Sequence, residues 1–340
     1  MRNLPSSGCQ RAKAPVRILF AGSPAIAVSS LVAISEMELA GEGIILAGVL
    51  TNPDTKRGRH SQCEPTDISA AALKLDVMRK EKGLPPITQL KAEKLNAAAR
   101  EEAAVLKADL LVSFAYGKIF GPKFLALFPL GGINIHPSLL PKYRGASPIS
   151  SVILDRKKTS GICIQRLAPE MDSGDILSME RFKLSGRETT LSLSETVGCS
   201  AAGILKKLLS GYAAKAARAK PQKGKATYCK EIKKEEGLIN WRKSAVSLDA
   251  QIRAFTPWPL SFTRSGSETL FILEAEPFIE NTALKALPGT VLRCDKTHGI
   301  LIQTGSGILA VKRLQWQAKK SLDWKAFCNG TRDFAGNRLG

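Results

Sequence analysis

Short apolar runs alternate with segments of helical periodicity over the first two thirds of the chain. The runs hold Ile, Leu and Val at consecutive positions and end in Gly, Pro, Ser or Asn, which is typical of strands buried on both faces of a parallel sheet. Such strands are predicted at residues 16–21, 43–50, 108–115, 132–136 and 161–167. Helices are predicted between them, at residues 24–37, 68–82 and 92–107. This alternation, to about residue 212, predicts a doubly wound, Rossmann-like α/β domain.

A different pattern begins at residue 213. Residues 213–226 contain neither an acidic residue nor a large apolar one, which predicts an exposed linker. A predicted helix at 247–255 is followed by short strands with Gly and Pro between them, as in a small β-barrel. These strands are expected at residues 269–275, 289–294, 299–303 and 307–311. We therefore predict four parts: a disordered leader at 1–15, an α/β domain at 16–212, the linker at 213–226 and an OB-like barrel at 227–340.

The charge of the chain favours a polyanionic partner. Lys and Arg total 50 against 30 Asp and Glu, and the net charge of +20 favours nucleic acid first and a membrane surface second. Residues 213–340 carry 22 basic and 11 acidic residues against 28 and 19 in residues 1–212, so the shorter C-terminal part is proportionally more basic. No apolar stretch approaches the roughly 18 residues that a membrane-spanning helix needs.

The seven cysteines argue against a disulfide framework and against a zinc site. Their number is odd, and no two of them are spaced as Cys-x-x-Cys. Reduced thiols are typical of cytoplasmic proteins, so a cytoplasmic location is predicted.

The segment from Asn134 to Arg144 carries the clearest chemical signal. Asn134 and His136 lie two residues apart at the end of a predicted strand, so their side chains share one face. An amide donor can polarise a carbonyl group, and an imidazole can move a proton near neutral pH. Pro137 and Pro141 then stop regular structure and predict a rigid loop at the sheet edge where parallel sheets place active sites.

A carboxylate is predicted to join this pair. Asp172 lies in a turn after the next buried strand, and successive strand ends of a parallel sheet converge on one edge. Asn, His and Asp together suit acyl transfer without a covalent intermediate, and no Gly-x-Ser-x-Gly elbow is present. Each of the three side chains also has a structural alternative as a turn former or buried hydrogen-bonding group, and Asp175 offers a second carboxylate.

The loop from Thr51 to His60 holds three cationic side chains within four residues, Lys56, Arg57 and Arg59. Two hypotheses fit this loop. It is either a solvated surface loop or a flexible loop that grips phosphate through Arg57 and Arg59.

Three segments together closely resemble the formyltransferase family that uses 10-formyltetrahydrofolate. They are Asn134–Pro141, Tyr143–Ile149 and Met171–Ile176. Further matches are similar to those family members that formylate methionyl-initiator tRNA, and they extend the resemblance from about Val16 to the end of the chain. They include Phe20–Pro24, Asn52–Asp54, Ala115–Gly117, Ile239–Trp241, Ile252–Pro259 and Gly336–Leu339. The resemblance implies an enzyme of translation initiation, with a Rossmann-like catalytic domain and an OB-like C-terminal domain that binds tRNA.

The resemblance also implies a role for individual residues. Asn134, His136 and Asp172 match the catalytic triplet of the family. The residues that match contacts with the folate co-substrate are Ser138, Leu139, Leu140, Pro141, Ala115, Tyr116 and Gly117. Those that match tRNA-binding positions are Arg57, Arg59, Lys215, Arg218, Lys220, Lys223 and Lys225. The resemblance implies no metal, and a monomer is expected.

The chain departs from the family pattern at two places. Pro137 stands where the family commonly has Gly, and Gly58-Arg59-His60-Ser61 stands where it often has Gly-Arg-Gly-Lys. Pro137 stiffens the loop that follows His136.

Two other functions remain open on the sequence. The N-terminal motifs would serve equally a formyltransferase that acts on a small amine, such as glycinamide ribonucleotide or an amino sugar. A non-catalytic RNA-binding protein would keep the basic C-terminal part beside a degenerate enzyme domain. The basic linker and C-terminal part favour tRNA over a small amine, and the intact Asn134, His136 and Asp172 favour an enzyme.

Overall fold

The structure is a computed structural model of the chain. It describes residues 14–56, 63–213, 218–279, 286–331 and 333–340. The chain divides into two compact units. The first extends to His136 and includes 162–180 and 197–223; the second comprises 137–161, 181–196 and 224–340.

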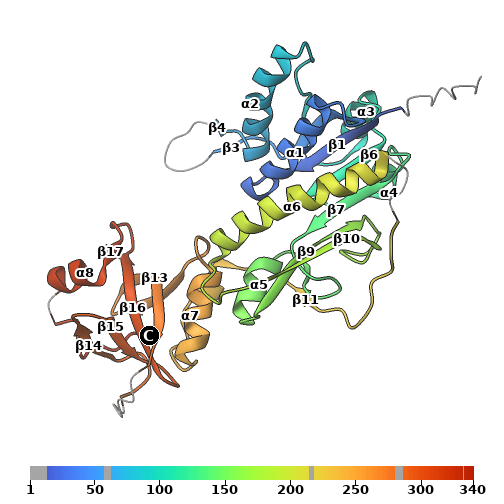
Figure 1. Cartoon of the computed structure of the whole chain (residues 1–340). Helices are drawn as coiled ribbons and strands as arrows, with labels where there is room; N and C mark the ends of the chain where they lie inside the picture. The colour runs from blue at the N-terminus through green and yellow to red at the C-terminus, as the bar shows by residue number, and fades with distance from the viewer. Residues whose placement is uncertain (1–13, 57–62, 214–217, 280–285, 332) are drawn as a thin grey trace, which may run out of the picture. The chain divides into compact units, whose positions relative to one another are not determined.

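A seven-stranded sheet forms the centre of the first unit (Figure 1). Its order is β10-β9-β7-β6-β1-β2-β5, with these bounds: β1 Val16–Gly22, β2 Ile44–Thr51, β5 Gln89–Lys91, β6 Leu110–Phe114, β7 Gly132–His136, β9 Thr159–Arg166 and β10 Ile176–Lys183. β1 pairs in parallel with β2 and β6, and β7 and β5 extend the parallel part on either side. The predicted Rossmann-like α/β domain is confirmed.

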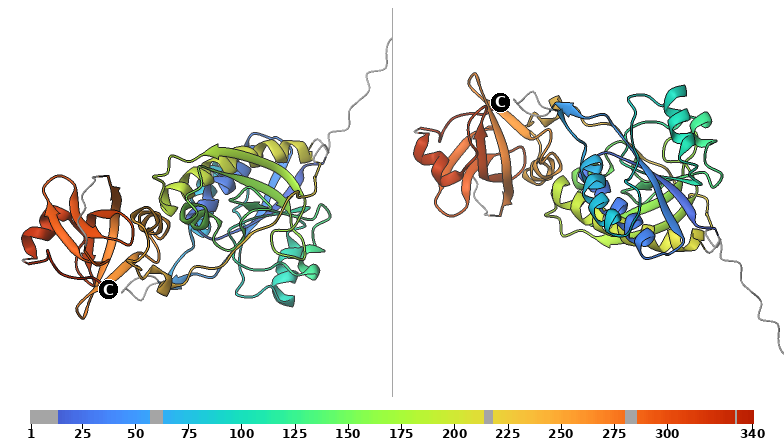
Figure 2. Two further views of the ribbon diagram at one scale, coloured as in Figure 1. Left: turned by 90° about the horizontal axis from the view of Figure 1, so that it is seen from below. Right: turned by 90° about the horizontal axis from the view of Figure 1, so that it is seen from above.

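Helices cover both faces of this sheet, which explains why its strands are apolar at consecutive positions. Leu19 and Ala21 of β1 share a core cluster with Ala103 of α3 (Ala97–Val105) and Phe124 of α4 (Pro122–Leu125). Phe20 between them is equally buried and points to the other face, because side chains alternate along a strand. Figure 2 shows α3 and α6 (Thr190–Ala213) on opposite sides of the sheet.

The predicted helices are present, with one shifted start. The helix expected at 24–37 is the short η1 (Ala25–Ala27) followed by α1 (Val28–Leu39), and that expected at 68–82 is α2 (Asp67–Glu81). The helix expected from residue 92 begins only at Ala97. Asn96 is its N-cap and accepts a hydrogen bond from Ala99 N at 3.1 Å, which satisfies a backbone donor of the first turn.

The expectation of a parallel sheet was wrong at β9. This strand runs antiparallel to β7, with His136 opposite Cys163 and Ile133 opposite Arg166. The chain between the two strands holds only the two-residue strand β8 (Arg144–Gly145) and the short helix α5 (Pro148–Leu154), so β9 starts beside the end of β7 and runs back along it. A parallel β9 would need a connection that recrosses the sheet.

An antiparallel sheet and two helices form most of the second unit. The sheet order is β12-β13-β16-β15-β14, with β17 also paired to β16. The bounds are α7 Ala245–Ala254, β12 Ser261–Ser265, β13 Glu268–Phe278, β14 Val291–Asp295, β15 Gly299–Gln303, β16 Ile308–Trp316, β17 Leu322–Asp323 and α8 Trp324–Gly330. Leu248 of α7 packs in one core with Leu270 and Leu309 of the sheet. Closure of this sheet into an OB-like barrel stays a prediction, as do the boundaries between the four predicted parts.

The second unit also holds a small parallel pair, β8 (Arg144–Gly145) with β11 (Tyr228–Cys229). Gly145 has φ +111°, and a Cβ at this position would lie 2.2 Å from Cys229 O. Only glycine therefore fits where the two segments meet.

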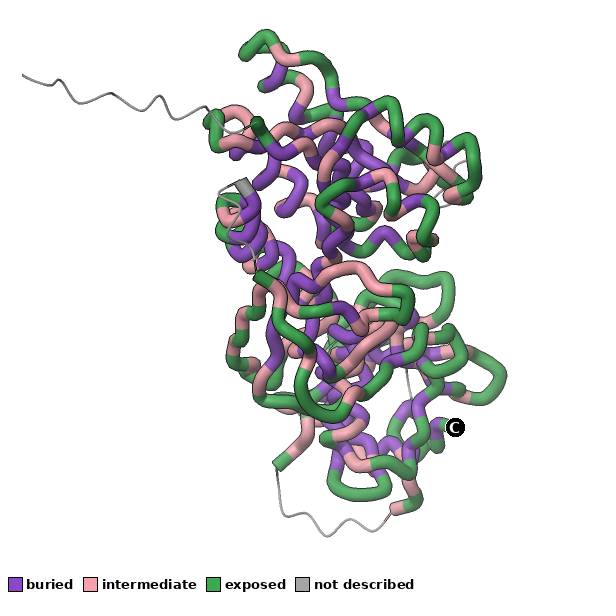
Figure 3. The backbone as a smooth tube through the Cα atoms, turned by 90° about the vertical axis from the view of Figure 1, so that its right-hand side faces the viewer, coloured by how far each residue is buried: buried purple, intermediate pink, exposed green. Residues whose placement is uncertain are grey.

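Figure 3 shows buried residues mostly in the interior of the fold and exposed residues mostly at its outer turns. Within the described residues, no helix is long and apolar enough to cross a membrane.

Candidate active site

The side chains of Asn134, His136 and Asp172 come together at the end of β7. Asp172 Oδ1 lies 3.5 Å from Asn134 Nδ2, at the limit of a hydrogen bond, and Asp172 Oδ2 lies 3.4 Å from His136 Nδ1. The side chains of His136 and Asp172 are only 5% and 11% exposed, so water screens their interaction weakly. The predicted grouping is therefore present, and the catalytic roles of the three residues stay a prediction.

Asp172 reaches this place by a different route from the one expected. Because β9 is antiparallel, its C-terminal end lies beside the start of β7, with Arg166 opposite Ile133. The loop 167–175 between β9 and β10 folds back from there, and Asp172 itself adopts a left-handed conformation with φ +52°. Gly174 makes the fold-back possible, since a Cβ there would lie 1.9 Å from Arg166 O.

Gln165 is a member of this site that the sequence pattern did not predict. It lies on β9 opposite Asn134, is 2% exposed, and donates from Nε2 to Asp172 Oδ1 at 2.8 Å. This is the shortest of the described contacts to the carboxylate. A signal was present, because Gln165 directly follows the apolar run Ile162–Ile164 in a predicted buried strand, and a polar residue that is buried needs a hydrogen-bond partner.

The carboxylate fixes the state of the imidazole. An ionised carboxylate only accepts hydrogen bonds, so the hydrogen of His136 lies on Nδ1, toward Asp172. The lone pair then lies on Nε2, which becomes the basic nitrogen of the ring. The arrangement can hold a proton acceptor next to an amide donor.

The loop Ser138–Pro141, predicted to contact the folate, is internally braced. Ser138 and Leu140 are 2% and 4% exposed, and Ser138 Oγ donates to Lys142 O at 2.6 Å. Pro141 O accepts from Thr227 N at 3.2 Å. The Ser138 hydroxyl therefore uses its hydrogen within the loop and keeps its oxygen as a possible acceptor.

The second segment predicted to contact the folate, Ala115–Gly117, is a tight turn after β6. Ala115 and Gly117 have φ +51° and +82° and are exposed, whereas Tyr116 is 2% exposed and stacks on Phe120 at 5.4 Å between ring centroids. Asn52 Nδ2 donates to Tyr116 O at 3.2 Å. Burial raises the pKa of Tyr116 to about 12, so its phenol is neutral at ordinary pH.

The predicted tRNA-binding residues are only partly described. Arg57, Arg59 and Lys215 lie outside the described residues. The described ones, Arg218, Lys220, Lys223 and Lys225, are exposed. The linker is nevertheless attached to the first unit, because Lys220 and Ile176 exchange two main-chain hydrogen bonds of 2.8 and 2.9 Å.

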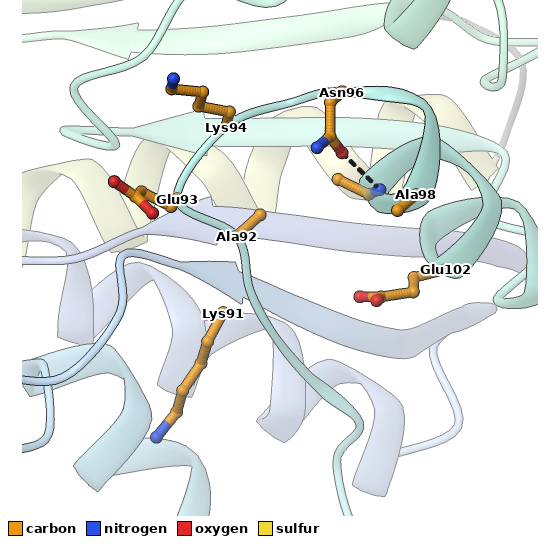
Figure 4. A pocket seen from close by; sticks show the side chains of 8 residues that line it. Lys91, Ala92, Glu93, Lys94, Asn96, Ala98 and Glu102 are labelled. Atoms are coloured by element: carbon orange, nitrogen blue, oxygen red, sulfur yellow. Dashed lines mark hydrogen bonds between the residues drawn. The ribbon is translucent and has the colours of Figure 1, made fainter.

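A shallow hollow elsewhere in the first unit contains none of the predicted site residues. It is lined by Lys91, Ala92, Glu93, Lys94, Asn96, Ala98, Ala99 and Glu102 (Figure 4). Lys91 is occupied by an ion pair with Asp54, and Asn96 by its role as N-cap of α3. In the part of the chain that the structure describes, no three His, Cys, Asp or Glu side chains are grouped so as to hold a metal ion.

Comparison with known proteins yields two family models and several relatives. The model described as formyl transferase matches residues 16–206, and that described as formyl transferase, C-terminal domain, matches residues 231–332. The methionyl-tRNA formyltransferase of Treponema denticola is 48% identical over 327 residues, which cover 94% of this chain and 98% of that protein. Its counterpart from Treponema pallidum is 40% identical over 328 residues, which cover 96% and 99%.

A solved structure supports the fold. The sugar 3N-formyl transferase WlaRD, determined in the presence of dTDP and 5-N-formyl-THF, matches with a TM-score of 0.61 at 20% identity. The match covers 90% of this chain and 99% of that one, so it extends into the C-terminal part. At this identity the likeness shows the fold alone.

Proposed function

The chain belongs to the formyl transferase family, and we propose that it transfers a formyl group from 10-formyltetrahydrofolate to the α-amine of methionyl-initiator tRNA. The observation that carries the proposal is the 48% identity to a methionyl-tRNA formyltransferase along nearly the full length of both chains. The product would serve translation initiation. We propose further that the enzyme acts in the cytoplasm as a monomer.

The donor set of the site suits formyl transfer. Bound 10-formyltetrahydrofolate supplies a formyl carbon as the electrophile. One N–H of the Asn134 amide faces Asp172, and the second is the donor for the formyl oxygen as that oxygen gains negative charge. Such a donor typically contributes about 3 kcal/mol to the lowering of a barrier. Ser138–Pro141 and Ala115–Gly117 are the segments that would hold the folate.

His136 moves the proton. The α-amine must be neutral to attack, and it loses a proton as its bond to the formyl carbon forms. His136 Nε2 accepts that proton and returns it to the folate nitrogen as the bond between this nitrogen and the formyl carbon breaks. Asp172 holds the ring in the required tautomer and stabilises the imidazolium that forms between the two steps.

Charge supports a tRNA acceptor. The net charge of +20 and the exposed linker cations suit salt-sensitive contacts with phosphate groups. A C-terminal part does not by itself distinguish a tRNA acceptor from a small amine, because the sugar-modifying WlaRD matches both parts of this chain as well. The basic charge and the close relatives are what favour tRNA over a small amine.

A single assay tests the proposal. The protein is incubated with 10-formyltetrahydrofolate and either methionyl-initiator tRNA, glycinamide ribonucleotide or an amino sugar, and the released tetrahydrofolate is followed. Turnover with charged tRNA alone is the expected result. Turnover with a free small amine would replace the proposed acceptor, and no turnover with any acceptor would favour a non-catalytic RNA-binding protein.

A further inference from the structure

One side chain of the linker reaches the candidate active site. Gln222 Nε2 donates to Asp172 O and to Gly174 O, both at 2.8 Å, and lies 3.2 Å from Gln165 Oε1. All three partners lie on β9 or on the loop 167–175. Gln222 therefore joins the segment between the two family domains to the loop that carries Asp172.

These contacts form a chain with one consistent direction. The Gln222 NH₂ group has two hydrogens for three acceptors, so one hydrogen is shared between a loop carbonyl and the oxygen of the Gln165 amide. The nitrogen of the Gln165 amide then points the other way, to Asp172 Oδ1. Asp172 in turn accepts from His136 Nδ1. Each amide orientation is fixed by the next group, and reversing one of them would place two acceptors or two donors against each other.

Apolar packing holds only the start of the loop 167–175, where Leu167 packs against the core cluster of Leu19 and Phe124. Pro169, Glu170, Met171 and Asp175 are exposed, and Met171 is 57% exposed. Asp172 stands in a left-handed conformation, which is uncommon for residues other than glycine, although aspartate adopts it more readily than most. With few buried apolar contacts, hydrogen bonds to the loop carbonyls are what select this conformation.

We propose that Gln222 is a positioning residue, whose side-chain amide holds the loop 167–175 so that the Asp172 carboxylate stays on His136 Nδ1. The inference rests on the proposed function, because it assumes that Asp172 and His136 serve formyl transfer. The linker is then a structural part of the catalytic site as well as a connection. Loss of the Gln222 amide moves the Asp172 carboxylate and lowers the rate of the chemical step, while binding of tRNA is retained.

The test compares Gln222→Ala and Gln222→Glu with wild type in formylation of methionyl-initiator tRNA. Loss of both N–H donors of the Gln222 amide predicts a fall in kcat of about tenfold or more for Gln222→Ala, with KM for tRNA within about twofold. Gln222→Glu is nearly isosteric, but it places a carboxylate oxygen where the amide donor faces three oxygens. Its kcat is therefore expected to fall at least as far. Gln317→Ala, at an exposed glutamine of the second unit, is the matched control.

A double-mutant cycle separates positioning from a general structural effect. In an Asp172→Ala background the carboxylate is absent, so Gln222→Ala should then change kcat by less than about twofold. An equal loss in both backgrounds, or an unchanged kcat for Gln222→Ala in wild type, would overturn the inference. Wild-type protein that fails to formylate tRNA would instead overturn the proposed function. Thermal unfolding of each variant shows whether a lower kcat comes from unfolding. If Gln222→Ala is unfolded at the assay temperature, the kcat of folded Gln222→Glu tests the inference in its place.

Discussion

Replacing Asp172 with Asn tests the direction of the hydrogen bonds in the site. Asp172 Oδ1 accepts from Gln165 Nε2 at 2.8 Å, and Oδ2 lies 3.4 Å from His136 Nδ1. Because Gln165 Oε1 accepts from Gln222, the nitrogen of Gln165 stays toward position 172, and the oxygen of the new amide takes the place of Oδ1. The new NH₂ group then faces His136 Nδ1, which must lose its hydrogen in order to accept. The hydrogen moves to Nε2.

An imidazole that carries its hydrogen on Nε2 cannot take a proton from the attacking amine. General acid–base catalysis typically contributes about 10²- to 10⁴-fold, which corresponds to about 3–5 kcal/mol at 1.36 kcal/mol per tenfold. We expect kcat of Asp172→Asn to fall by a factor in this range, measured in single-turnover formylation with both substrates saturating. Asp175→Asn is the matched control, since Asp175 is an exposed carboxylate three residues away. A folded Asp172→Asn enzyme within about fivefold of the wild-type rate would refute the tautomer argument.

Three further predictions address proton transfer, tRNA binding and the fold. His136→Ala should lower kcat by about 10²-fold or more while folate affinity, measured by fluorescence titration, is unchanged; near-normal turnover would refute its role. Replacing both Lys223 and Lys225 with Gln should raise KM for tRNA. It should also lower the slope of log KM against log salt concentration by the equivalent of about two phosphate contacts, and an unchanged slope would contradict this prediction. Gly145→Ala should lower the free energy of unfolding in urea by about 2 kcal/mol or more, because the new Cβ would meet Cys229 O and the backbone conformation is strained for alanine. An unchanged unfolding midpoint would contradict this prediction.

The sequence missed elements that lack an apolar run. β10 alternates between half-buried and exposed residues, and the helices α5 and α8 have seven residues each. Short helices and edge strands are stabilised mainly by their neighbours, so local composition gives a weak signal for them. The buried strands β1, β2, β6 and β7 were predicted because both of their faces are covered, which requires apolar side chains at consecutive positions.

By itself, the sequence determined the local geometry of the site. Two residues of one strand, Asn134 and His136, must share a face because side chains alternate along a strand, and Pro137 must end that strand because proline lacks a backbone N–H. The turn after the next buried strand offered Asp172 or Asp175 as a carboxylate for this pair, and the resemblance to a family selected Asp172. None of this information depends on how distant segments pack.

Only the tertiary structure decided how Asp172 reaches His136 and what keeps it there. The antiparallel direction of β9 depends on where the preceding segment returns to the sheet, which no local pattern encodes. The contacts of Gln165 and Gln222 with Asp172 join residues that are 7 and 50 positions away from it. A glutamine has the same local propensity whether or not a carbonyl faces it, so its partner becomes visible only when the chain has folded.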